Sequence, residues 1–256
     1  MINGGLYALN VAQFLEKGFP EKFSFEQDYL EKPLRLEQYR TKAPEMFGLV
    51  QDTYFIDIGI PEDFKKAQHD FASMPLDLKK ITKDWTLFLD RDGVINEEKP
   101  GSYIFNPDEF VFYEGVLKAL KTFTGKFGKI IVITNQRGIG KGLMTDNDLT
   151  AIHDKLLLAA KNEGATIDGI YYCSSVNPWD PNRKPNPGMA TKAKKDFPGI
   201  NLRQSIMVGN TPGDMRFGRN AGMYTVFIKT TKPDHPFPHV DIDLAFNSLI
   251  DFARAL

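Results

Sequence analysis

Two aspartates one residue apart, Asp90 and Asp92, follow a short apolar run and precede Gly93. Alternate residues of an extended chain share a face, so both carboxylates can point into one site. If the apolar run is a buried strand that turns at Gly93, the acids lie at its carboxyl end, where open α/β sheets bind their ligands. One carboxylate could then act as a nucleophile while the other transfers protons. An ordinary turn is the alternative, because Asp and Gly also favour turns.

A second apolar run ends in a hydroxyl and an amide, those of Thr134 and Asn135. Such groups can donate hydrogen bonds to the oxygens of a phosphate. A glycine-rich stretch follows over residues 136–142, and it is either a loop around an anionic substrate or a plain surface loop. The side chains in it that we predict to bind substrate are those of Gln136, Arg137 and Lys141.

Two adjacent cations, Arg183 and Lys184, precede a predicted helix that begins near Gly188. A lysine beside a carboxylate nucleophile and a phosphate offsets the repulsion between them. An arginine can make a forked contact with a second phosphate. A solvated pair of surface cations is the alternative interpretation.

Oxygen ligands for a metal ion follow a later apolar run, at Asn210 and Asp214. Together with the Asp90 carboxylate and the backbone carbonyl of Asp92, they would suit Mg²⁺, which prefers hard oxygen ligands and keeps several waters. Each of these signals is weak when taken alone. Because they follow successive apolar runs in order, together they predict one site at one edge of a sheet.

Apolar runs alternate with amphipathic stretches from about residue 85 onward, which predicts a Rossmann-like, three-layer parallel sheet of the α/β class. The predicted strands cover residues 85–90, 129–134, 168–173, 205–209 and 223–228. The predicted helices lie near residues 115–125, 146–163, 188–196, 213–221 and 246–255. The intervals between the site residues have room for one helix and its loops, so we expect no cap domain. Specificity would then come from loops at 93–112, 136–145 and 174–187.

The first part of the chain does not follow this alternation. We predict a small N-terminal region over residues 1–71, a linker over 72–84 and the α/β domain over 85–256. The N-terminal region is rich in Phe and contains a strand-like run at 54–60. A helix should follow at 61–71, with proline at its first position.

The composition is that of a globular protein, with 42% hydrophobic and 25% charged residues among 256. A net charge of −1, without long runs of one sign, argues against nucleic acid or a membrane as the partner. The single cysteine excludes an internal disulfide and fits a reducing compartment. No apolar stretch reaches the roughly 18 residues that span a bilayer, and the N-terminus lacks the layout of a signal peptide. We therefore predict a cytoplasmic protein.

Five motifs within residues 85–228 resemble the haloacid dehalogenase superfamily of phosphohydrolases, in particular its D-glycero-D-manno-heptose 1,7-bisphosphate phosphatases and histidinol-phosphatases. The motifs are Phe88-Leu-Asp-Arg-Asp-Gly-Val-Ile-Asn96, Val132-Ile-Thr-Asn-Gln-Arg-Gly-Ile139, Asp168-Gly-Ile-Tyr-Tyr-Cys173, Arg183-Lys-Pro-Asn-Pro-Gly-Met189 and Val208-Gly-Asn-Thr-Pro-Gly-Asp-Met215. The resemblance implies a Mg²⁺-dependent phosphatase that acts on a small sugar bisphosphate. Histidinol phosphate or another small monoester is an alternative substrate. A weakly active or non-catalytic sugar-phosphate-binding module is an alternative of a different class.

The resemblance also implies a role for each matching residue. Asp90 would be the nucleophile that forms an aspartyl-phosphate, and Asp92 would act as acid and then as base. Thr134 and Asn135 would hold the phosphoryl group, and Lys184 would steady the nucleophile and the phosphate. Mg²⁺ would bridge the nucleophile and the phosphate and neutralise charge during transfer.

The chain departs from the family pattern in two places. Heptose phosphatases usually carry a zinc-binding loop of several Cys and one His, of which only Cys173 is present here, so we expect no zinc. Where the family generally has an acidic metal ligand after Val-Gly, this chain has Asn210. An amide oxygen can still bind Mg²⁺, but one negative charge is lost, so we expect weaker metal affinity. Asp214 could replace the ligand, directly or through water.

The N-terminal region resembles the C-terminal part of sugar-phosphate nucleotidyltransferases, through the motifs Ile2-Asn-Gly-Gly-Leu-Tyr7, Phe23-Ser-Phe-Glu-Gln-Asp28 and Tyr54-Phe-Ile-Asp-Ile-Gly-Ile-Pro-Glu-Asp63. Asp57 matches a metal-binding acid of that family, but the glycine-rich nucleotide loop is absent. We therefore assign Asp57 no catalytic role. The apolar residues of this region would be covered by the phosphatase domain, by self-association or by a nucleotidyltransferase partner.

Overall fold

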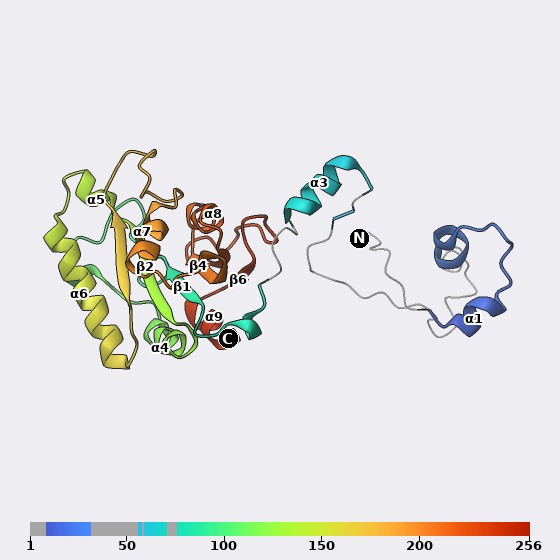
Figure 1. Cartoon of the computed structure of the whole chain (residues 1–256), viewed down its shortest axis with the longest axis horizontal. Coiled ribbons are helices and arrows are strands. Elements are labelled where there is room, and N and C mark those ends of the chain that lie inside the picture. Colours follow the sequence, from blue (N-terminus) through green and yellow to red (C-terminus); the bar gives the residue numbers. More distant parts are fainter. Residues whose placement is uncertain (1–8, 32–55, 58, 71–75) are drawn as a thin grey trace. The chain divides into compact units, whose positions relative to one another are not determined.

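The computed structural model describes residues 9–31, 56–57, 59–70 and 76–256 (Figure 1). Its contacts divide the chain into two units, Met1–Phe64 and Lys65–Leu256, which are described separately. The motif predicted at residues 2–7 lies outside the described residues, as does part of the strand-like run at 54–60. The described residues of that run are not in a strand.

The described part of the first unit contains a cluster of aromatic rings beside two short helical segments. Helix α1 (Val11–Glu16) precedes a π-helical segment at Phe25–Glu31. The rings of Phe19 and Phe23 stack with their centroids 4.6 Å apart. Phe14 meets Tyr29 edge to face at 5.0 Å. Aromatic pairs of this kind provide much of the apolar contact that such a small unit can form.

The second unit is built on a six-stranded sheet with the strand order β3-β2-β1-β4-β5-β6, and every neighbouring pair is parallel. The strands are β1 (Thr86–Leu89), β2 (Lys129–Asn135), β3 (Gly169–Cys173), β4 (Ser205–Gly209), β5 (Tyr224–Ile228) and β6 (Leu244–Phe246). The parallel α/β sheet predicted from the sequence is confirmed. The short strand β6 was not predicted, and its last residue, Phe246, falls within the stretch predicted as the last helix, which in the structure begins at Leu249.

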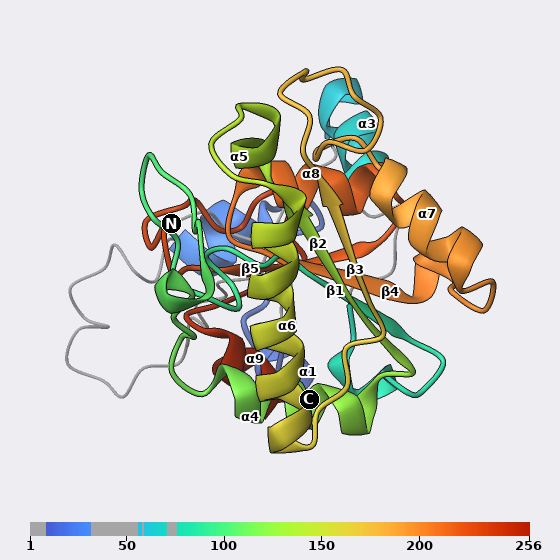
Figure 2. The same ribbon diagram turned by 90° about the vertical axis from the view of Figure 1, so that its left-hand side faces the viewer.

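Helices cover both faces of the sheet, so the unit has three layers (Figures 1 and 2). One face carries α4 (Val116–Lys126), α6 (Asp146–Glu163) and α9 (Leu249–Ala255), and the other carries α7 (Gly188–Asp196) and α8 (Pro212–Asn220). Strand β1 shows why both faces are apolar. Its Leu87 and Leu89 belong to the first core cluster, whereas Phe88 between them belongs to the second. Alternating side chains of a covered strand have to be apolar on both sides.

The described loops between the strands contain no folded cap domain, as the sequence predicted. Between the strands they add only the short helix α5 (Arg137–Gly140) and 3-10 turns at Pro107–Glu109 and Leu202–Gln204. Helix α3 (Pro61–Asp70) begins with proline, as predicted, and the last residue of the predicted helix, 71, lies outside the described residues.

The end of the predicted linker packs onto the second unit. Leu76 and Ile81 are buried in its larger core cluster, on either side of a 3-10 turn at Leu78–Lys80. Within the described ranges, no helix has both the length and the apolar character that crossing a bilayer requires.

Candidate active site

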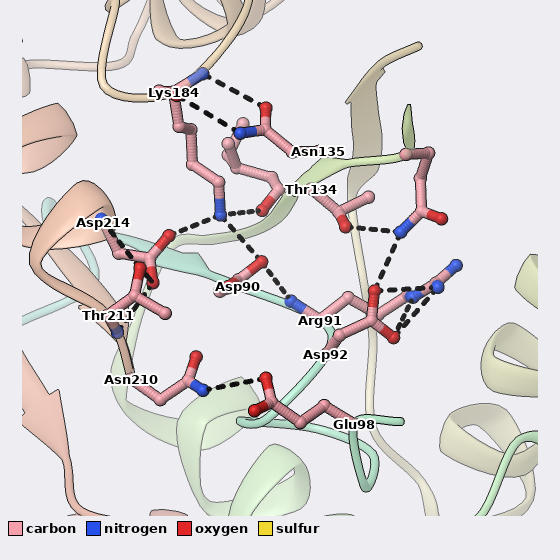
Figure 3. Close-up of polar contacts among 12 residues, drawn as sticks. Asp90, Arg91, Asp92, Glu98, Thr134, Asn135, Lys184, Asn210, Thr211 and Asp214 are labelled. Atoms are coloured by element: carbon pink, nitrogen blue, oxygen red, sulfur yellow. Dashed lines mark hydrogen bonds and ion pairs between the residues drawn. The ribbon is translucent and has the colours of Figure 1, made fainter. Parts of the chain in front are cut away.

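Polar residues from neighbouring strands meet at the carboxyl edge of the sheet (Figure 3). Asp90 follows β1, Asn135 ends β2 and Asn210 follows β4, and these three strands are adjacent. Lys184 comes from the loop before α7, and Asp214 from the first turn of α8. The structure therefore brings together residues that the sequence placed at the ends of separate apolar runs.

The ammonium group of Lys184 lies between two carboxylates and is almost fully buried. Its Nζ is 2.7 Å from Asp90 Oδ1 and 2.6 Å from Asp214 Oδ1, and it also donates to the carbonyl of Ile133 at 3.2 Å. Burial by itself lowers the pKa of Lys184, but the charges of Asp214 and Asp90 outweigh it, so the pKa is raised overall. Lys184 therefore stays charged and offsets the repulsion between the two acids.

Asp90 is poised between its charged and neutral forms. Burial and, to a lesser extent, the charge of Asp214 raise the pKa of this carboxyl to about 7, although the charge of Lys184 opposes both effects. Its Oδ1 also accepts a hydrogen bond from the backbone nitrogen of Arg91 at 2.8 Å. A further positive charge beside Asp90 would favour its anionic, nucleophilic form.

Asp92 is held by four donors on three neighbouring side chains. Arg91 Nη2 donates to both carboxylate oxygens at 2.9 Å, and Arg91 Nε to Oδ1 at 3.2 Å. Asn96 Nδ2 and Gln136 Nε2 each donate at 2.9 Å. Burial alone would raise the pKa of Asp92, but the charge of Arg91 and these hydrogen bonds lower it overall. The carboxylate is thereby fixed in orientation and kept ionised.

Arg91 and His153 support this arrangement from below, and the sequence did not single them out. The guanidinium of Arg91 is fully buried, its Nη1 lies 3.2 Å from His153 Nε2 and its carbon lies 5.8 Å from the ring centroid of Phe110. Burial and the charge of Arg91 together lower the pKa of His153 to about 4. A neutral imidazole can accept the hydrogen bond that Arg91 offers. His153 lies on the apolar face of a predicted helix, and this position is the signal that could have identified it.

The residues at the end of β2 have different surroundings. Gln136 is buried rather than exposed on a loop, and its Nε2 links Asp92 to Thr134 Oγ1 at 2.7 Å. Asn135 exchanges two hydrogen bonds with the backbone of Lys184, at 3.1 and 3.2 Å. It therefore fixes the loop that carries the lysine.

The three cations predicted to bind substrate lie on the loops around the site. Arg137 and Lys141 are exposed at the two ends of α5, and Lys141 Nζ lies 5.4 Å from the ring centroid of Tyr103. Arg183 is partly buried and donates to the carbonyl of Ser175 at 2.8 Å. This hydrogen bond holds Arg183 against the loop after β3, where heptose phosphatases usually carry zinc ligands that this chain lacks.

Asn210 is fully buried, and its two amide atoms have different surroundings. Its Nδ2 donates to Thr231 Oγ1 at 2.8 Å and lies 3.5 Å from Glu98 Oε2, whereas its Oδ1 has no hydrogen-bond partner. Asp214 has partners for both oxygens: Oδ1 faces Lys184, and Oδ2 accepts hydrogen bonds from the nitrogen and hydroxyl of Thr211.

The donors at this site fit a hard cation such as Mg²⁺. A buried amide oxygen without a partner is costly unless a ligand or ion completes its coordination, and Asn210 Oδ1 is such an atom at this site. Among the described residues, no cluster of three or more His, Cys, Asp or Glu forms a metal site by itself. Cys173 is a buried thiol whose pKa is raised by burial.

Taken together, the parallel sheet, the paired aspartates at the end of its central strand and the lysine between two acids define a phosphate-transferring hydrolase. The family model described as polynucleotide kinase 3 phosphatase matches residues 84–254. The chain belongs to this family of the haloacid dehalogenase superfamily and is a phosphoric monoester hydrolase.

Three of the similar proteins are named heptose 1,7-bisphosphate phosphatases. A D-glycero-alpha-D-manno-heptose-1,7-bisphosphate 7-phosphatase of Burkholderia mallei is 36% identical over 158 residues, which covers 57% of this chain and 80% of that protein. The protein of the same name from Mycobacterium bovis is 33% identical over 173 residues, which covers 67% of this chain and 91% of that protein. The crystal structure of a D,D-heptose 1,7-bisphosphate phosphatase from B. bronchiseptica, complexed with magnesium and phosphate, has a TM-score of 0.60 and 27% identity, covering 66% and 96%.

Proposed function

We propose that this protein is a Mg²⁺-dependent phosphatase that hydrolyses heptose 1,7-bisphosphate or a closely related sugar bisphosphate. The observation that carries the proposal is the position of Asp90, a buried carboxylate at the end of β1 with Lys184 Nζ at 2.7 Å and Asp92 beside it. The names of the similar proteins support the choice of substrate. The described residues between the strands add no folded cap domain, so we expect the site to admit a small sugar phosphate with two charged ends.

In the first chemical step, an oxygen of Asp90 attacks the phosphorus and the bond to the sugar oxygen breaks. Asp92 donates a proton to the leaving oxygen. Arg91 lowers the pKa of Asp92 in the free protein, and the negative charge of an arriving phosphate counteracts this effect. Asp92 then removes a proton from the water that hydrolyses the aspartyl-phosphate.

Other residues bind and steady the phosphoryl group. Thr134 and Asn135 donate hydrogen bonds to it, and Lys184 balances the charge of the nucleophile. The Asp90 carboxylate, the carbonyl of Asp92 and Asn210 Oδ1 hold Mg²⁺, which when bound supplies positive charge to the nucleophile and the phosphate. Asp214 is left to hold Lys184, because both its oxygens have protein partners.

The second phosphate of the substrate would meet the cations on the loops. Arg183 is the first candidate, because it is adjacent to Lys184 in the chain and its side chain is held by the carbonyl of Ser175. Arg137 and Lys141 on α5 are the others. A weakly active sugar-phosphate-binding protein is the second candidate function, and the neutral Asn210 favours it.

The proposal is tested by measuring phosphate release from heptose 1,7-bisphosphate, a heptose monophosphate and histidinol phosphate. We expect the bisphosphate to be the best substrate, with turnover that stops when EDTA removes Mg²⁺. Preference for histidinol phosphate would assign the alternative substrate. No release from any of the compounds, with Mg²⁺ present, would favour the binding protein.

A further inference from the structure

The cation site of this chain has a neutral amide, Asn210, where a carboxylate was expected. The net charge of the surrounding residues shows how much negative charge remains for a cation. Arg91 and Asp92 form an ion pair and add no net charge. Asp90 and Asp214 share the single cation Lys184, which leaves one net negative charge. A divalent ion would therefore lack one balancing charge unless another acid contributes.

Glu98 is an acid in direct contact with the amide. Its Oε2 lies 3.5 Å from Asn210 Nδ2, and its side chain is partly buried. Figure 3 shows Glu98 beside Asn210, across from Asp214 and Lys184. With Glu98, the residues around the site carry two net negative charges, which match a divalent cation.

The same contacts fix the orientation of the amide. A carboxylate accepts hydrogen bonds but cannot donate them, so the nitrogen of Asn210 faces Glu98. Thr231 Oγ1 accepts from this nitrogen at 2.8 Å. Gly93 leaves the space for it, because a Cβ there would lie 2.0 Å from Nδ2, and the backbone has a φ of +86°. The oxygen is thereby directed away from Glu98 and has no partner.

We propose that Glu98 and Thr231 complete the cation site that Asn210 alone would leave weak. Thr231 holds the amide so that Oδ1 faces the ion, and Glu98 supplies the missing carboxylate charge, acting on the ion or on its bound waters. The proposal rests on the Mg²⁺ dependence of the proposed function. It adds two residues, from the loops after β1 and β5, to the cation site.

The test is calorimetric titration of the full chain with MgCl₂ in the absence of substrate. We expect Glu98→Gln and Thr231→Val each to raise the dissociation constant for Mg²⁺ about tenfold or more, as the loss of outer partners of a metal site does. Glu97→Gln is the matched control, because it removes the same charge from the adjacent, exposed residue. Its affinity should stay within about twofold of the parent. Thr231→Ser, which keeps the hydroxyl, should bind Mg²⁺ as the parent does.

A second comparison tests whether Glu98 substitutes for the missing acid. In an Asn210→Asp background, Glu98→Gln should cost much less affinity than it does in the parent chain, because the new aspartate supplies the charge. An equal cost in both backgrounds, or equal effects of Glu98→Gln and Glu97→Gln, would overturn the proposal. Melting curves in EDTA establish that each variant is folded.

The titration also separates this proposal from the proposed function. Mg²⁺ binding that depends on Glu98, in a chain that hydrolyses none of the sugar phosphates, would keep the cation site and remove the phosphatase assignment. If the chain releases phosphate but its Mg²⁺ affinity does not depend on Glu98 or Thr231, the phosphatase assignment would stand and the proposed cation site would fall. A parent chain that binds no Mg²⁺ would reject both.

Discussion

At the scale of single residues, the site depends on one lysine shared by two acids. Asp90 and Asp214 are buried and close to the same Nζ, so Lys184 offsets the repulsion between them. Asp90 nonetheless remains strained electrostatically, because burial and Asp214 raise its pKa to about 7. A further cation beside Asp90 would favour its anionic, nucleophilic form, which would couple metal binding to reactivity.

We expect Asp90→Asn to abolish phosphate release, because the carboxylate is the proposed nucleophile. The same substitution should stabilise the metal-free protein. The folded-state pKa of Asp90 is about 7 against an ordinary value of 3.8, so between these values the folded state binds more protons than the unfolded state. Its contribution to stability therefore falls as the pH rises through this range and is least favourable above about pH 7.

Urea unfolding in EDTA measures this effect. Asparagine cannot ionise, so we expect Asp90→Asn to raise the free energy of unfolding by about 1–3 kcal/mol at about pH 8, and by less at about pH 5. A gain that is the same at both pH values would show that Asp90 is not the group responsible.

At the scale of elements, helix α8 links the stability of the fold to the geometry of the site. Thr211 and Asp214 form a capping box at the start of α8, and the second oxygen of Asp214 holds Lys184. Helix α6 begins with the same motif, formed by Thr145 and Asp148, which is exposed. The chain thus contains two equivalent caps, of which one touches the site.

This pair gives a controlled experiment. We expect Thr211→Ala and Thr145→Ala to lower the free energy of unfolding by similar amounts, about 1 kcal/mol each. Only Thr211→Ala should reduce turnover, by about tenfold, because it loosens Asp214 and with it Lys184. Steady-state kinetics and urea unfolding of both variants provide the comparison. Equal turnover in the two would mean that the cap does not position the lysine.

Helix α6 supports the general acid through His153 and Arg91. His153→Phe should leave Arg91 Nη1 without its buried acceptor, which costs about 1–3 kcal/mol of stability and loosens the hold on Asp92. We expect kcat to fall while the dissociation constant for Mg²⁺ is unchanged. His153→Gln keeps an acceptor and should retain most of the parent kcat. A phenylalanine variant with normal kcat would remove His153 from the supporting network.

The sequence allowed much of this fold to be predicted, because strands, strand ends and helix caps are local signals. Asp90, Asn135 and Asn210 could be placed on one sheet edge from their apolar runs alone. The contacts of Glu98 and of Thr231 with Asn210 could not be predicted, because they join separate loops. Glu98 is 112 residues from Asn210 in the sequence, and Thr231 is 21 residues from it. Arg91 was missed for a related reason: an alternating strand predicts that it faces away from the acids, whereas its long side chain folds back onto Asp92.

At the scale of the whole molecule, the chain is divided unequally between its two units. Every residue that we place in the site lies in the unit Lys65–Leu256, which also contains the entire described sheet. The predicted division into an N-terminal region, a linker and a phosphatase domain stays a prediction, and so does the partner of the first unit. The contact boundary after Phe64 lies before the predicted linker.

We expect a chain reduced to residues 65–256 to hydrolyse its substrate and bind Mg²⁺ within about twofold of the full chain, because a unit with its own core and sheet can fold alone. Light scattering of both chains tests the first unit separately: if residues 1–64 mediate self-association, only the full chain should exceed the mass of one copy. Loss of turnover by the shorter chain, with its melting transition intact, would mean that the first unit takes part in catalysis. A shorter chain that keeps both its activity and the oligomeric mass would instead place the contact between copies on the phosphatase unit.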